Sequence, residues 1–552
     1  MENDIIRQRW EALKTDRSSW LSHWKDISGY VLPRSGRYFV GDKNNGDKRY
    51  NDIYDNTGTR ALRILGAGLM SGATSPARPW FRLSTADPAL ADHAPVKVWL
   101  ADVTRLMLAI FAKSNTYRAL HSVYDELGAF GTAPTIIEPN FSNVIHHHTL
   151  TAGEYAIATD ALGVVDTLYR ETQLTVAQIV KEFGLKACTQ TTQNLHRDGK
   201  LNALVTIIHA IEPREDRDYG AKDAKNMAFK SCYFEVNAER GKYLRESGFK
   251  RFPGLAPRWQ TTSNDVYGNS PAMESLGDIK QLQHEQLRKA QGIDYKTKPP
   301  LQAPTSMKNS PANMLPGGVT FVDSVGPNNG VRSMFDVNLD LSHLLEDIRD
   351  VRERIRDAFY TPLFLMLAND TRSGVTATEI AERHEEKLLM LGPVLERLHN
   401  ELLDPLIEIT FDRMVAANIV PTPPPEMQGQ DLNVEFVSVL AQAQRSVATG
   451  SIDRYVSNLG MVASIKPEVI DKFDADAWAD KYSDMLGVHP ELVVASDKVA
   501  LIREQRAQIA RQQAQAAQMQ QHADTAAKLA SAKTGNEQNA LTDVTRAFSG
   551  YS

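Results

Sequence analysis

Hydrophobic side chains near the start of the chain recur at intervals of three, four and seven residues. This is the spacing of one helix face, so we predict a helix over the first ~30 residues that ends at Pro33. Helices are also predicted over residues 57–71, where small side chains allow a close neighbour, and over 94–113. The apolar positions that define the first helix are Trp10, Leu13, Trp20, Trp24 and Ile27.

Between Phe130 and about Phe252 the pattern changes to short runs rich in β-branched side chains. Examples are Thr135-Ile136-Ile137 and Leu204-Val205-Thr206-Ile207-Ile208, which are typical of strands. One helix is predicted to interrupt them near residues 175–183. The first half of the chain is therefore predicted to be α+β.

The second half is predicted to be mainly helical. Pro271 stands at the first position of a helix predicted over residues 271–298. Proline is tolerated there, because the N–H that it lacks would have no partner within the helix. A second helix is predicted over 341–361, ended by Pro362. The residues between the two helices, 299–340, form a loop-rich insert with one strand-like run. The predicted fold class is α+β, mainly helical.

Prolines and glycines divide the remaining residues. Kinks are predicted at Gly392-Pro393 and Pro405 of a long helix. The last helix, about 498–533, is dominated by Gln and Ala and buries little apolar area alone, so it either stays solvated or packs against copies of itself. The predicted segments are a polar loop over 367–375, the long helix from 376 or 378 to 417, a linker over 421–425, shorter helices over about 434–496 and the last helix over about 498–533.

Composition restricts the function classes. With 552 residues, 42% of them hydrophobic, the chain should form about three or four folded units. No apolar run approaches the ~20 residues that span a bilayer, and the polar start is unlike a signal peptide. A net charge of -6 argues against a tight, sequence-independent DNA binder, so contacts with nucleic acid should be local or weak. Two cysteines, Cys188 and Cys232, favour a reducing compartment such as cytoplasm.

Catalytic motifs are missing from the sequence. The phosphate-binding loop, G-x-S-x-G and H-E-x-x-H are all absent. His146-His147-His148 is the one metal-like run, but neighbouring side chains of a strand point to opposite faces, which favours a solvated or interfacial strand over a metal site. Glu382, Glu385 and Glu386 fit the solvated start of a helix better than an acidic metal cluster. We predict a non-enzymatic chain without metal or cofactor.

The predicted helix over 341–361 has three separate stripes. Four acidic residues fall within about 60° of one another, a set of apolar residues lies opposite, and three arginines occupy one flank. Like charges four residues apart repel, so the segregation favours a helix in a ring over a plain surface helix of a monomer, although the second interpretation stays open. The acids are Glu346, Asp350, Glu353 and Asp357, the arginines are Arg349, Arg352 and Arg356, and the apolar residues are Leu344, Ile348, Val351, Ile355 and Phe359.

The preceding helix repeats this arrangement with Glu274, Asp278 and Glu285 on one side. In a ring, the arginine flank would meet the carboxylates of a neighbouring chain. The acidic face would line a shared lumen.

Several multi-residue segments follow one another over residues 1–415. The most specific runs from Tyr54-Asp55-Asn56-Thr57-Gly58 through residues 66–76 to Pro79-Trp80-Phe81-Arg82-Leu83. The others are Trp20-Leu21-Ser22-His23-Trp24, Tyr30-Val31-Leu32-Pro33, Phe130-Gly131-Thr132-Ala133, Phe252-Pro253, Pro257-Arg258-Trp259, Tyr267-Gly268-Asn269-Ser270-Pro271-Ala272-Met273, Lys298-Pro299-Pro300-Leu301, Thr376-Ala377-Thr378-Glu379-Ile380, Leu391-Gly392-Pro393-Val394 and Glu401-Leu402-Leu403-Asp404-Pro405-Leu406. In this order they resemble the head-to-tail connector, or portal, proteins of short-tailed bacteriophages.

The resemblance implies a ring, usually of twelve copies, at one vertex of the capsid. Such a ring is a conduit for double-stranded DNA in packaging and ejection, and it docks terminase and tail adaptors. The implied partners are other copies of the chain, major capsid and scaffolding proteins, terminase, adaptors, and DNA bound weakly without sequence preference. No membrane partner is implied. The implied location is the virion, with assembly in the host cytoplasm.

The resemblance also implies a portal fold with named parts. The acidic stripe would line the DNA channel, the arginines would lie between subunits, and a tunnel loop would narrow the pore with Arg372 touching DNA. The implied parts are an α/β wing (1–270), two stem helices (271–298 and 341–361), a clip (299–340), a tunnel loop (362–375), a kinked wing helix (376–427), a crown (428–497) and a C-terminal barrel helix (498–552). The tunnel-loop residues are Asn369, Asp370, Arg372, Ser373 and Gly374, and the clip residues are Pro304, Pro311, Pro316, Gly317, Val319 and Phe321.

Two other function classes stay open on the sequence. A tail or baseplate component that never contacts DNA would share the low basic content and the helical second half. A packaging nuclease or ATPase is disfavoured because it needs a phosphate-binding loop or a convergent carboxylate cluster, neither of which is found.

Overall fold

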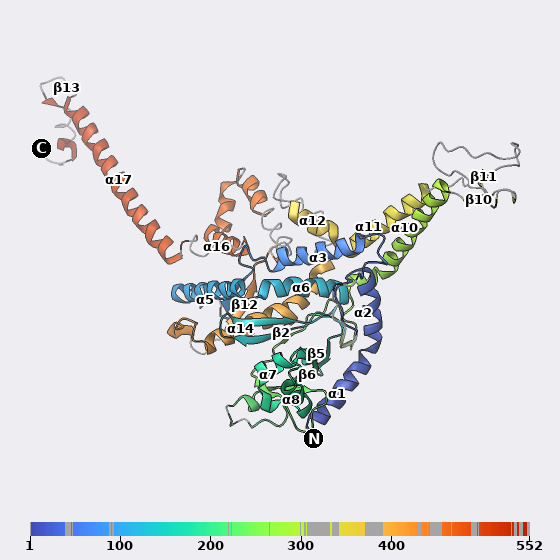
Figure 1. The fold of residues 1–552 in the computed structure, drawn as a ribbon. Coiled ribbons are helices and arrows are strands. Elements are labelled where there is room, and N and C mark those ends of the chain that lie inside the picture. Colours follow the sequence, from blue (N-terminus) through green and yellow to red (C-terminus); the bar gives the residue numbers. More distant parts are fainter. Residues whose placement is uncertain are drawn as a thin grey trace. The chain divides into compact units, whose positions relative to one another are not determined.

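The computed structural model divides the chain into two units, Met1–Gly450 and Ser451–Ser552, which we call the first and second unit. It describes residues 2–38, 46, 48–87, 90, 93–218, 220–221, 223–263, 265–298, 300–302, 305, 308, 332–333, 342–369, 390–427, 432–438, 440–441, 455–464, 466–486, 494, 496–531, 533–534, 538–539 and 545–548. Figure 1 shows the elements in sequence colours.

The first unit begins with two helices where the sequence predicted one. The indole of Trp24 is fully buried and donates a hydrogen bond to the carbonyl of Phe130. Arg17, between the helices, is also buried, and its guanidinium donates to the carbonyl oxygen of Tyr155. This tertiary contact fixes the joint, and apolar spacing gave no sign of it. The helices are α1 (Glu2–Asp16) and α2 (Ser18–Tyr30).

Three further helices carry the centre of the first unit. The predictions over 57–71 and 94–113 are confirmed by α3 (Thr57–Ala73) and α5 (Ala94–Lys113), whereas α6 (Thr116–Phe130) was not predicted. The predicted close approach at the small residues of α3 is confirmed, because a Cβ on Gly68 would lie 2.2 Å from the ring of Phe364. Only glycine therefore lets this neighbour pack so closely on α3.

Antiparallel sheets fill the β-rich region that the sequence predicted. A five-stranded sheet has the order β4-β5-β6-β7-β8, and a three-stranded sheet has the order β3-β2-β9. The strands are β2 (Thr135–Asn140), β3 (Val144–Thr149), β4 (Tyr155–Thr159), β5 (Val165–Thr175), β6 (Leu204–Pro213), β7 (Phe229–Glu235), β8 (Arg245–Phe249) and β9 (Gly254–Leu255).

Short helices lie between these strands. The predicted helix near 175–183 is confirmed by α7 (Val176–Phe183), which begins with a capping box formed by Thr175 and Gln178. A second helix, α8 (Gln190–Arg197), was not predicted, because its few apolar residues give it no clear periodicity. The remaining turns are the 3-10 helices η1 (Leu185–Ala187) and η2 (Ala224–Asn226).

A pair of helices leaves the centre of the first unit side by side (Figure 1). The helix predicted over 271–298 is confirmed as α9 (Pro271–Glu274) followed by α10 (Leu276–Thr297), and its partner over 341–361 as α11 (Ser342–Ala358). At the base of the insert, β10 (Leu301–Gln302) pairs with β11 (Arg332–Ser333).

The loop segment predicted over 362–375, with its polar part over 367–375, is partly wrong, because a helix reaches Asn369. Pro362 does not simply end α11. It stands at the second position of a new helix, α12 (Thr361–Asn369), where proline is tolerated and an apolar run follows. Helical residues 390–398 continue into a π-helix (His399–Leu403) and then α14 (Asp404–Ala416). The kink predicted at Pro405 thus coincides with a π-turn. The π-turn interrupts the regular i→i−4 hydrogen bonds of the helix at the place where proline has no N–H to donate.

Residues after α14 are not all helical as predicted. After η5 (Pro425–Met427), β12 (Leu432–Phe436) pairs antiparallel with β1 (Phe81–Thr85). This long-range pairing leaves no signal in the local pattern. One apolar core of the first unit joins α2, α3, α5, α6, α11 and α14.

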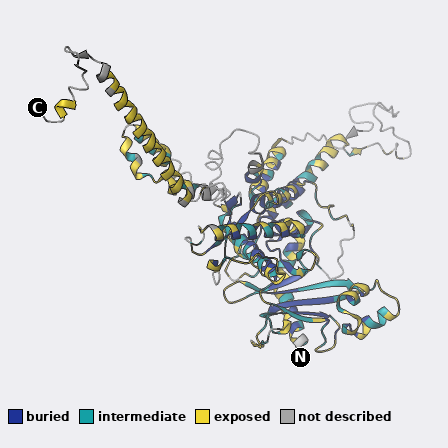
Figure 2. Cartoon of the chain, turned by 90° about the vertical axis from the view of Figure 1, so that its left-hand side faces the viewer, coloured by how far each residue is buried: buried dark blue, intermediate teal, exposed yellow. Residues whose placement is uncertain are grey.

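The second unit is described by itself. It contains a helical stretch over 455–464, η6 (Pro467–Lys472), α16 (Ala475–Leu486), α17 (Ser496–Ser531) and the small pair β13 (Lys533–Thr534) and β14 (Gln538–Asn539). The predicted last helix is therefore confirmed. Figure 2 shows it exposed along its length.

Candidate functional site

The α10–α11 pair carries the acidic stripe that the sequence singled out. All four acids of α11 are exposed, while the opposite face of the helix is buried. The predicted segregation of α11 is confirmed, because Ile348, Val351 and Ile355 are among its buried residues and Leu344 packs partly buried against the same core. The exposed acids are Glu346, Asp350, Glu353 and Asp357.

The arginine flank of α11 divides into two environments. Arg349 and Arg356 are exposed. Arg352 instead donates from Nε and Nη2 to one carboxylate oxygen of Asp55, at 3.0 and 2.6 Å. The contact seen for Arg352 therefore lies within its own chain, and a contact of the three arginines with a neighbouring subunit stays a prediction.

Asp55 joins both helices of the pair to the start of α3. Its other carboxylate oxygen accepts hydrogen bonds from the backbone N–H and the hydroxyl of Thr57. Gln283 of α10 accepts from the N–H of Asp55 and donates to its carbonyl. Burial would raise the pKa of Asp55, but the hydrogen bonds from Thr57 and Arg352 lower it below its usual value. The carboxylate thus stays ionised and fixes α10 and α11 against α3.

Glu285 of α10 does not belong to an exposed stripe, as its spacing had suggested. It is buried against α11, where its carboxyl faces Asp347. Burial, together with the hydrogen bond and charge of Asp347, raises the pKa of Glu285. Asp278 pairs with Arg354 at 3.2 Å, whereas Glu274 is exposed. Packing between the helices, which periodicity along one helix does not report, explains the difference.

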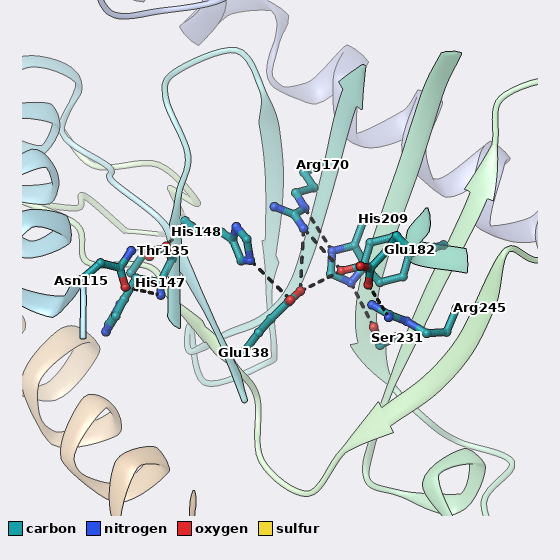
Figure 3. Close-up of polar contacts among 11 residues, drawn as sticks. Asn115, Thr135, Glu138, His147, His148, Arg170, Glu182, His209, Ser231 and Arg245 are labelled. Carbon is teal, nitrogen blue, oxygen red and sulfur yellow. Dashed lines mark hydrogen bonds and ion pairs between the residues drawn. The ribbon is translucent and has the colours of Figure 1, made fainter. Parts of the chain in front are cut away.

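A polar cluster links the three-stranded sheet to the five-stranded one (Figure 3). The carboxylate of Glu138 on β2 accepts a hydrogen bond from the Tyr233 hydroxyl at 2.8 Å and lies 3.4 Å from Nε2 of His148. Burial would raise the pKa of Glu138, but the hydrogen bond and charge of His148 outweigh it and lower the pKa. Arg170 completes the charge balance at 3.8 Å from Glu138.

His209 occupies the inner end of the same cluster. Its ring stacks on Tyr233 with centroids 3.8 Å apart, and burial lowers its pKa well below the usual value, so the ring is neutral. Nδ1 accepts from Arg170 at 3.1 Å, which leaves the proton on Nε2 to donate to the Ser231 hydroxyl at 3.0 Å. Every member of the cluster is satisfied by another member, so the arrangement supports a structural link between sheets and no reactive group.

The histidine run lies on β3 and alternates as predicted. His146 and His148 share one face, with ring centroids 4.9 Å apart. His147 faces the other way, is buried, and lies with Nε2 3.0 Å from the Thr116 hydroxyl. Burial lowers the pKa of His147 to about 3. Of the predicted solvated or interfacial strand, the side that carries His147 is the packed one, because β3 lies with this face against α6.

A cavity of about 1090 Å³ lies between the β4–β5 turn, residues 250–265 and the helical residues 393–409. One wall of the cavity carries Arg258, whose side chain is buried. It pairs with Glu401 of the π-helix at 2.6 Å and donates to the carbonyl of Gly163 at 2.8 Å. Arg397 also pairs with Glu401. The π-turn thus positions a carboxylate that ties the long helix to a strand turn.

Neither a metal site nor a membrane span emerges from the described residues. Those residues hold no group of three or more His, Cys, Asp or Glu side chains that could bind a metal ion. In the described part of the chain no helix is long and apolar enough to cross a membrane.

Several predicted site residues lie outside the described residues. Of the five tunnel-loop residues named from the sequence, Asn369 alone is described, as the last residue of α12. Outside lie Asp370, Arg372, Ser373 and Gly374 of the tunnel loop, Pro304, Pro311, Pro316, Gly317, Val319 and Phe321 of the clip, and Glu382, Glu385 and Glu386.

Sequence reasoning missed the two ion pairs that fix the helices. Asp55 and Arg258 each lie in a segment that resembles the connector family, and this was the only available signal. Their partners, Arg352 and Glu401, are separated from them by 297 and 143 residues. No local pattern connects residues so far apart.

Comparison with known proteins gives the family. Residues 3–493 match the family described as "Bacteriophage head to tail connecting protein". The chain is 65% identical over 550 residues to the "Probable portal protein" of Bordetella phage BPP-1, covering 100% of this chain and 99% of that protein. It is 43% identical over 547 residues to the "Portal protein" of Salmonella phage epsilon15, covering 99% and 98%.

More distant likenesses are weaker. The "Portal protein" of Escherichia phage T7 is 23% identical over 448 residues, covering 77% of each chain. A chain of the "Virion of native gene transfer agent (GTA) particle" is 10% identical with a TM-score of 0.34, covering 84% of this chain and 98% of that one. At that TM-score the likeness is too weak to define the fold.

The chain belongs to the family of bacteriophage head-to-tail connecting proteins. It is a portal protein, a structural, non-enzymatic component of the virion at the junction of head and tail. Membership implies an oligomeric ring with capsid and tail partners. The predicted family, function class and location are therefore confirmed, and the packaging-enzyme alternative is excluded.

Proposed function

We propose that twelve copies of this chain form a closed ring at one capsid vertex, and that double-stranded DNA passes through its centre. In this ring α10 and α11 are the stem and the acids of α11 line the channel. The exposure of all four acids, opposite a face on which Ile348, Val351 and Ile355 are buried, carries the proposal. A wall that repels phosphates suits rapid passage of a polyanion.

The mass of the purified assembly tests ring formation. Twelve chains of 61.4 kDa give about 737 kDa. A mass near 61.4 kDa at micromolar concentration would contradict a stable ring.

The acidic channel is tested by reversing its charge. With Glu346, Asp350, Glu353 and Asp357 all changed to lysine, DNA should bind the wall, so packaging and ejection should slow, and added salt should relieve the defect. Changing four exposed acids of the proposed wing segment to lysine, Asp16, Asp52, Glu215 and Asp216, is the matched control. If DNA passes through rings of the stem variant at the normal rate at low salt, the acidic stripe does not line the channel and lies elsewhere, for example between subunits.

The remaining parts of the proposal follow the family. The segment 1–270 forms most of the wing, 299–340 the clip that docks terminase and adaptors, the helical part of 376–427 the long wing helix, the part of 428–497 beyond Ala441 the crown, because β12 and Leu440 pack into the first unit, and 498–552 a helix of a C-terminal barrel. Because a lone strand is unstable in water, the clip should pair with the clips of adjacent subunits. Deletion of Thr305–Asn329 should therefore leave soluble protein that neither closes rings nor binds an adaptor. Normal rings with normal adaptor binding would contradict the clip assignment.

The loop after α12 is proposed to narrow the pore. Arg372 is its only cation, so contacts with the DNA backbone would be weak and independent of base sequence. Removing Asp370–Ser373 should preserve assembly and incorporation into capsids but reduce retention of packaged DNA. Full retention of genome-length DNA by this variant would exclude a gate at the loop.

A further inference from the structure

The buried seam between α10 and α11 ends part-way along the helix pair. Glu285 is the last buried residue of α10, and Ile348 is the first buried residue of α11. Beyond these two positions, toward the insert, no described side chain of either helix is buried. We call residues 286–297 of α10 and 342–346 of α11 the outer part of the pair. Because little apolar burial holds it together, the polar contact at the end of the seam decides whether it stays closed.

Two carboxyl groups meet at the end of this seam. Glu285 is 8% exposed, and its carboxyl lies against that of Asp347, an exposed residue one position before Ile348. Oε1 of Glu285 accepts a hydrogen bond from the Gln281 amide at 2.6 Å. Oε2 is buried and receives no hydrogen bond from the described residues. Two ionised carboxylates in contact repel, and a buried oxygen without a donor is destabilising, so a proton between the two carboxyls removes both penalties.

Arg354 of α11 does not neutralise this contact. It attracts the ionised form of Glu285, but its guanidinium is already paired with Asp278 at 3.2 Å and with Asp350 at 3.4 Å. Burial, with the hydrogen bond and charge of Asp347, outweighs Arg354 and raises the pKa of Glu285. The other titratable or charged residues within four positions of the pair are His284, Arg288 and Lys289 on α10 and His343, Glu346 and Arg349 on α11. On the elements packed against the two helices they are His23, Lys25 and Asp26 of α2, Asp55 before α3, Arg60 and Arg63 of α3, and Glu274 of α9.

We propose that Glu285 and Asp347 form a clasp that one shared proton closes, and that loss of this proton lets the outer part of the α10–α11 pair separate. With the proton present, one carboxyl donates to the other and the end of the seam is satisfied. With both groups ionised, like charges face each other at the point where apolar burial ends. Both residues belong to one chain, so the clasp does not depend on the proposed ring.

The sign of the pH dependence follows from the raised pKa of Glu285. The folded chain holds this proton more tightly than the unfolded chain, whose glutamates titrate near ~4.3. The stability that the clasp adds is therefore fully present below about pH 4 and is lost as pH rises through the folded pKa. Raising the pH should open the outer part, while the apolar seam from Ile348 onward stays closed.

Hydrogen exchange of the full chain, followed by mass spectrometry, tests the clasp. Amide exchange of the outer part is compared between about pH 5 and about pH 8, after division by the intrinsic exchange rate at each pH. Opening should increase about two- to fivefold in the wild type, the range expected for an interaction between partly exposed charges. The amides of α3, which lie in the core, give the contribution of global unfolding, and this contribution is subtracted.

Two substitutions remove the shared proton without removing the hydrogen-bonding group. Glu285→Gln and Asp347→Asn each replace one carboxyl by an amide that can donate to the other carboxyl, so the outer part should stay closed at about pH 8 and its opening should not depend on pH. Asp347 is exposed, so its substitution should leave the core intact. Asp294→Asn, which removes an exposed carboxylate of the outer part, is the matched control and should open with pH like the wild type.

Several results would overturn the clasp. A wild-type outer part that does not open with pH, or a pH dependence that either amide variant retains, shows that no shared proton holds the helices. Loss of the pH dependence in Asp294→Asn as well would assign the effect to the general charge of the outer part. If millimolar calcium or magnesium closes the outer part at about pH 8 and a chelator reopens it, a cation and not a proton lies between the two carboxylates.

Discussion

The two units of the chain bury their side chains to very different degrees. In the first unit the largest of three apolar clusters runs from α2 to α14 and includes the fully buried Trp24, Trp80 and Phe130. In the second unit, α17 has 36 residues, and every residue whose burial is described from Ala500 to Lys528 is exposed. The first unit can fold as one subunit. The long helix α17 gains most of its stability only if copies of it pack together, because intrinsic helix propensity stabilises an isolated helix only weakly.

The largest expected effect on the free energy of unfolding comes from a substitution that opens a cavity in the core of the first unit. Trp24→Ala removes a fully buried indole that also donates to the carbonyl of Phe130, so the free energy of unfolding should fall by about 3–5 kcal/mol. Met519→Ala on α17 should change it by less than about 0.5 kcal/mol. Chemical denaturation followed by tryptophan fluorescence measures both. Equal effects would remove the contrast between the units.

A pH-dependent effect should come from Glu126 on α6. Burial raises the pKa of Glu126 to about 7, although it accepts hydrogen bonds from Thr151 and Ala152. The folded chain therefore holds this proton more tightly than the unfolded chain, whose glutamates titrate near ~4.3. Stability should fall as pH rises from about 4.5 to about 7, by no more than about 3 kcal/mol.

Glu126→Gln isolates this contribution, because the amide fits the same site and does not titrate. The difference in unfolding free energy between wild type and variant should change between pH 4.5 and pH 7.5. A difference that stays constant over this range would show that Glu126 is ionised in the folded chain.

A smaller effect with the opposite sign is expected at Asp55. Its folded pKa lies below the usual value, so the stability it adds is present above about pH 4 and is lost as pH falls through the folded pKa. Asp55→Asn should cost about 1–3 kcal/mol at pH 7, less than a fully buried pair, because the Arg352 side chain is 38% exposed. Asp278→Asn, which loses the more exposed pair with Arg354, should cost less than about 1 kcal/mol.

The sequence predicted those features that depend on local spacing. Periodicity and proline positions were enough to predict the limits of α3, α5 and α17, the β-rich region and the stripes of α11. The pairing of β1 with β12 and the π-turn before Pro405 were missed, because contacts between distant segments determine them. Spacing also misassigned Glu285, whose burial depends on which face of α10 meets α11.

The candidate site shows the same division between local features, which the sequence predicted, and long-range contacts, which it did not. The exposed acids of α11 were predicted correctly as one face, since a helix places residues four apart on the same side. The partner of Arg352 was not, because Asp55 lies 297 residues away in the chain. Long-range ion pairs leave no periodic signal, and only the family resemblance pointed to the segment that contains Asp55.

The smallest expected effect follows from removing the second unit. A chain that ends after Gly450 should unfold within about 0.5 kcal/mol of the full chain, because the core of the first unit includes no residue beyond Ala441. The full chain as a monomer should show an additional, broad loss of helical circular dichroism from α17, whose Gln- and Ala-rich sequence gives no cooperative packing. In assembled rings that loss should become sharper and move to higher temperature. If it stays broad in the ring, copies of α17 do not pack together, and the helix is solvated in both states.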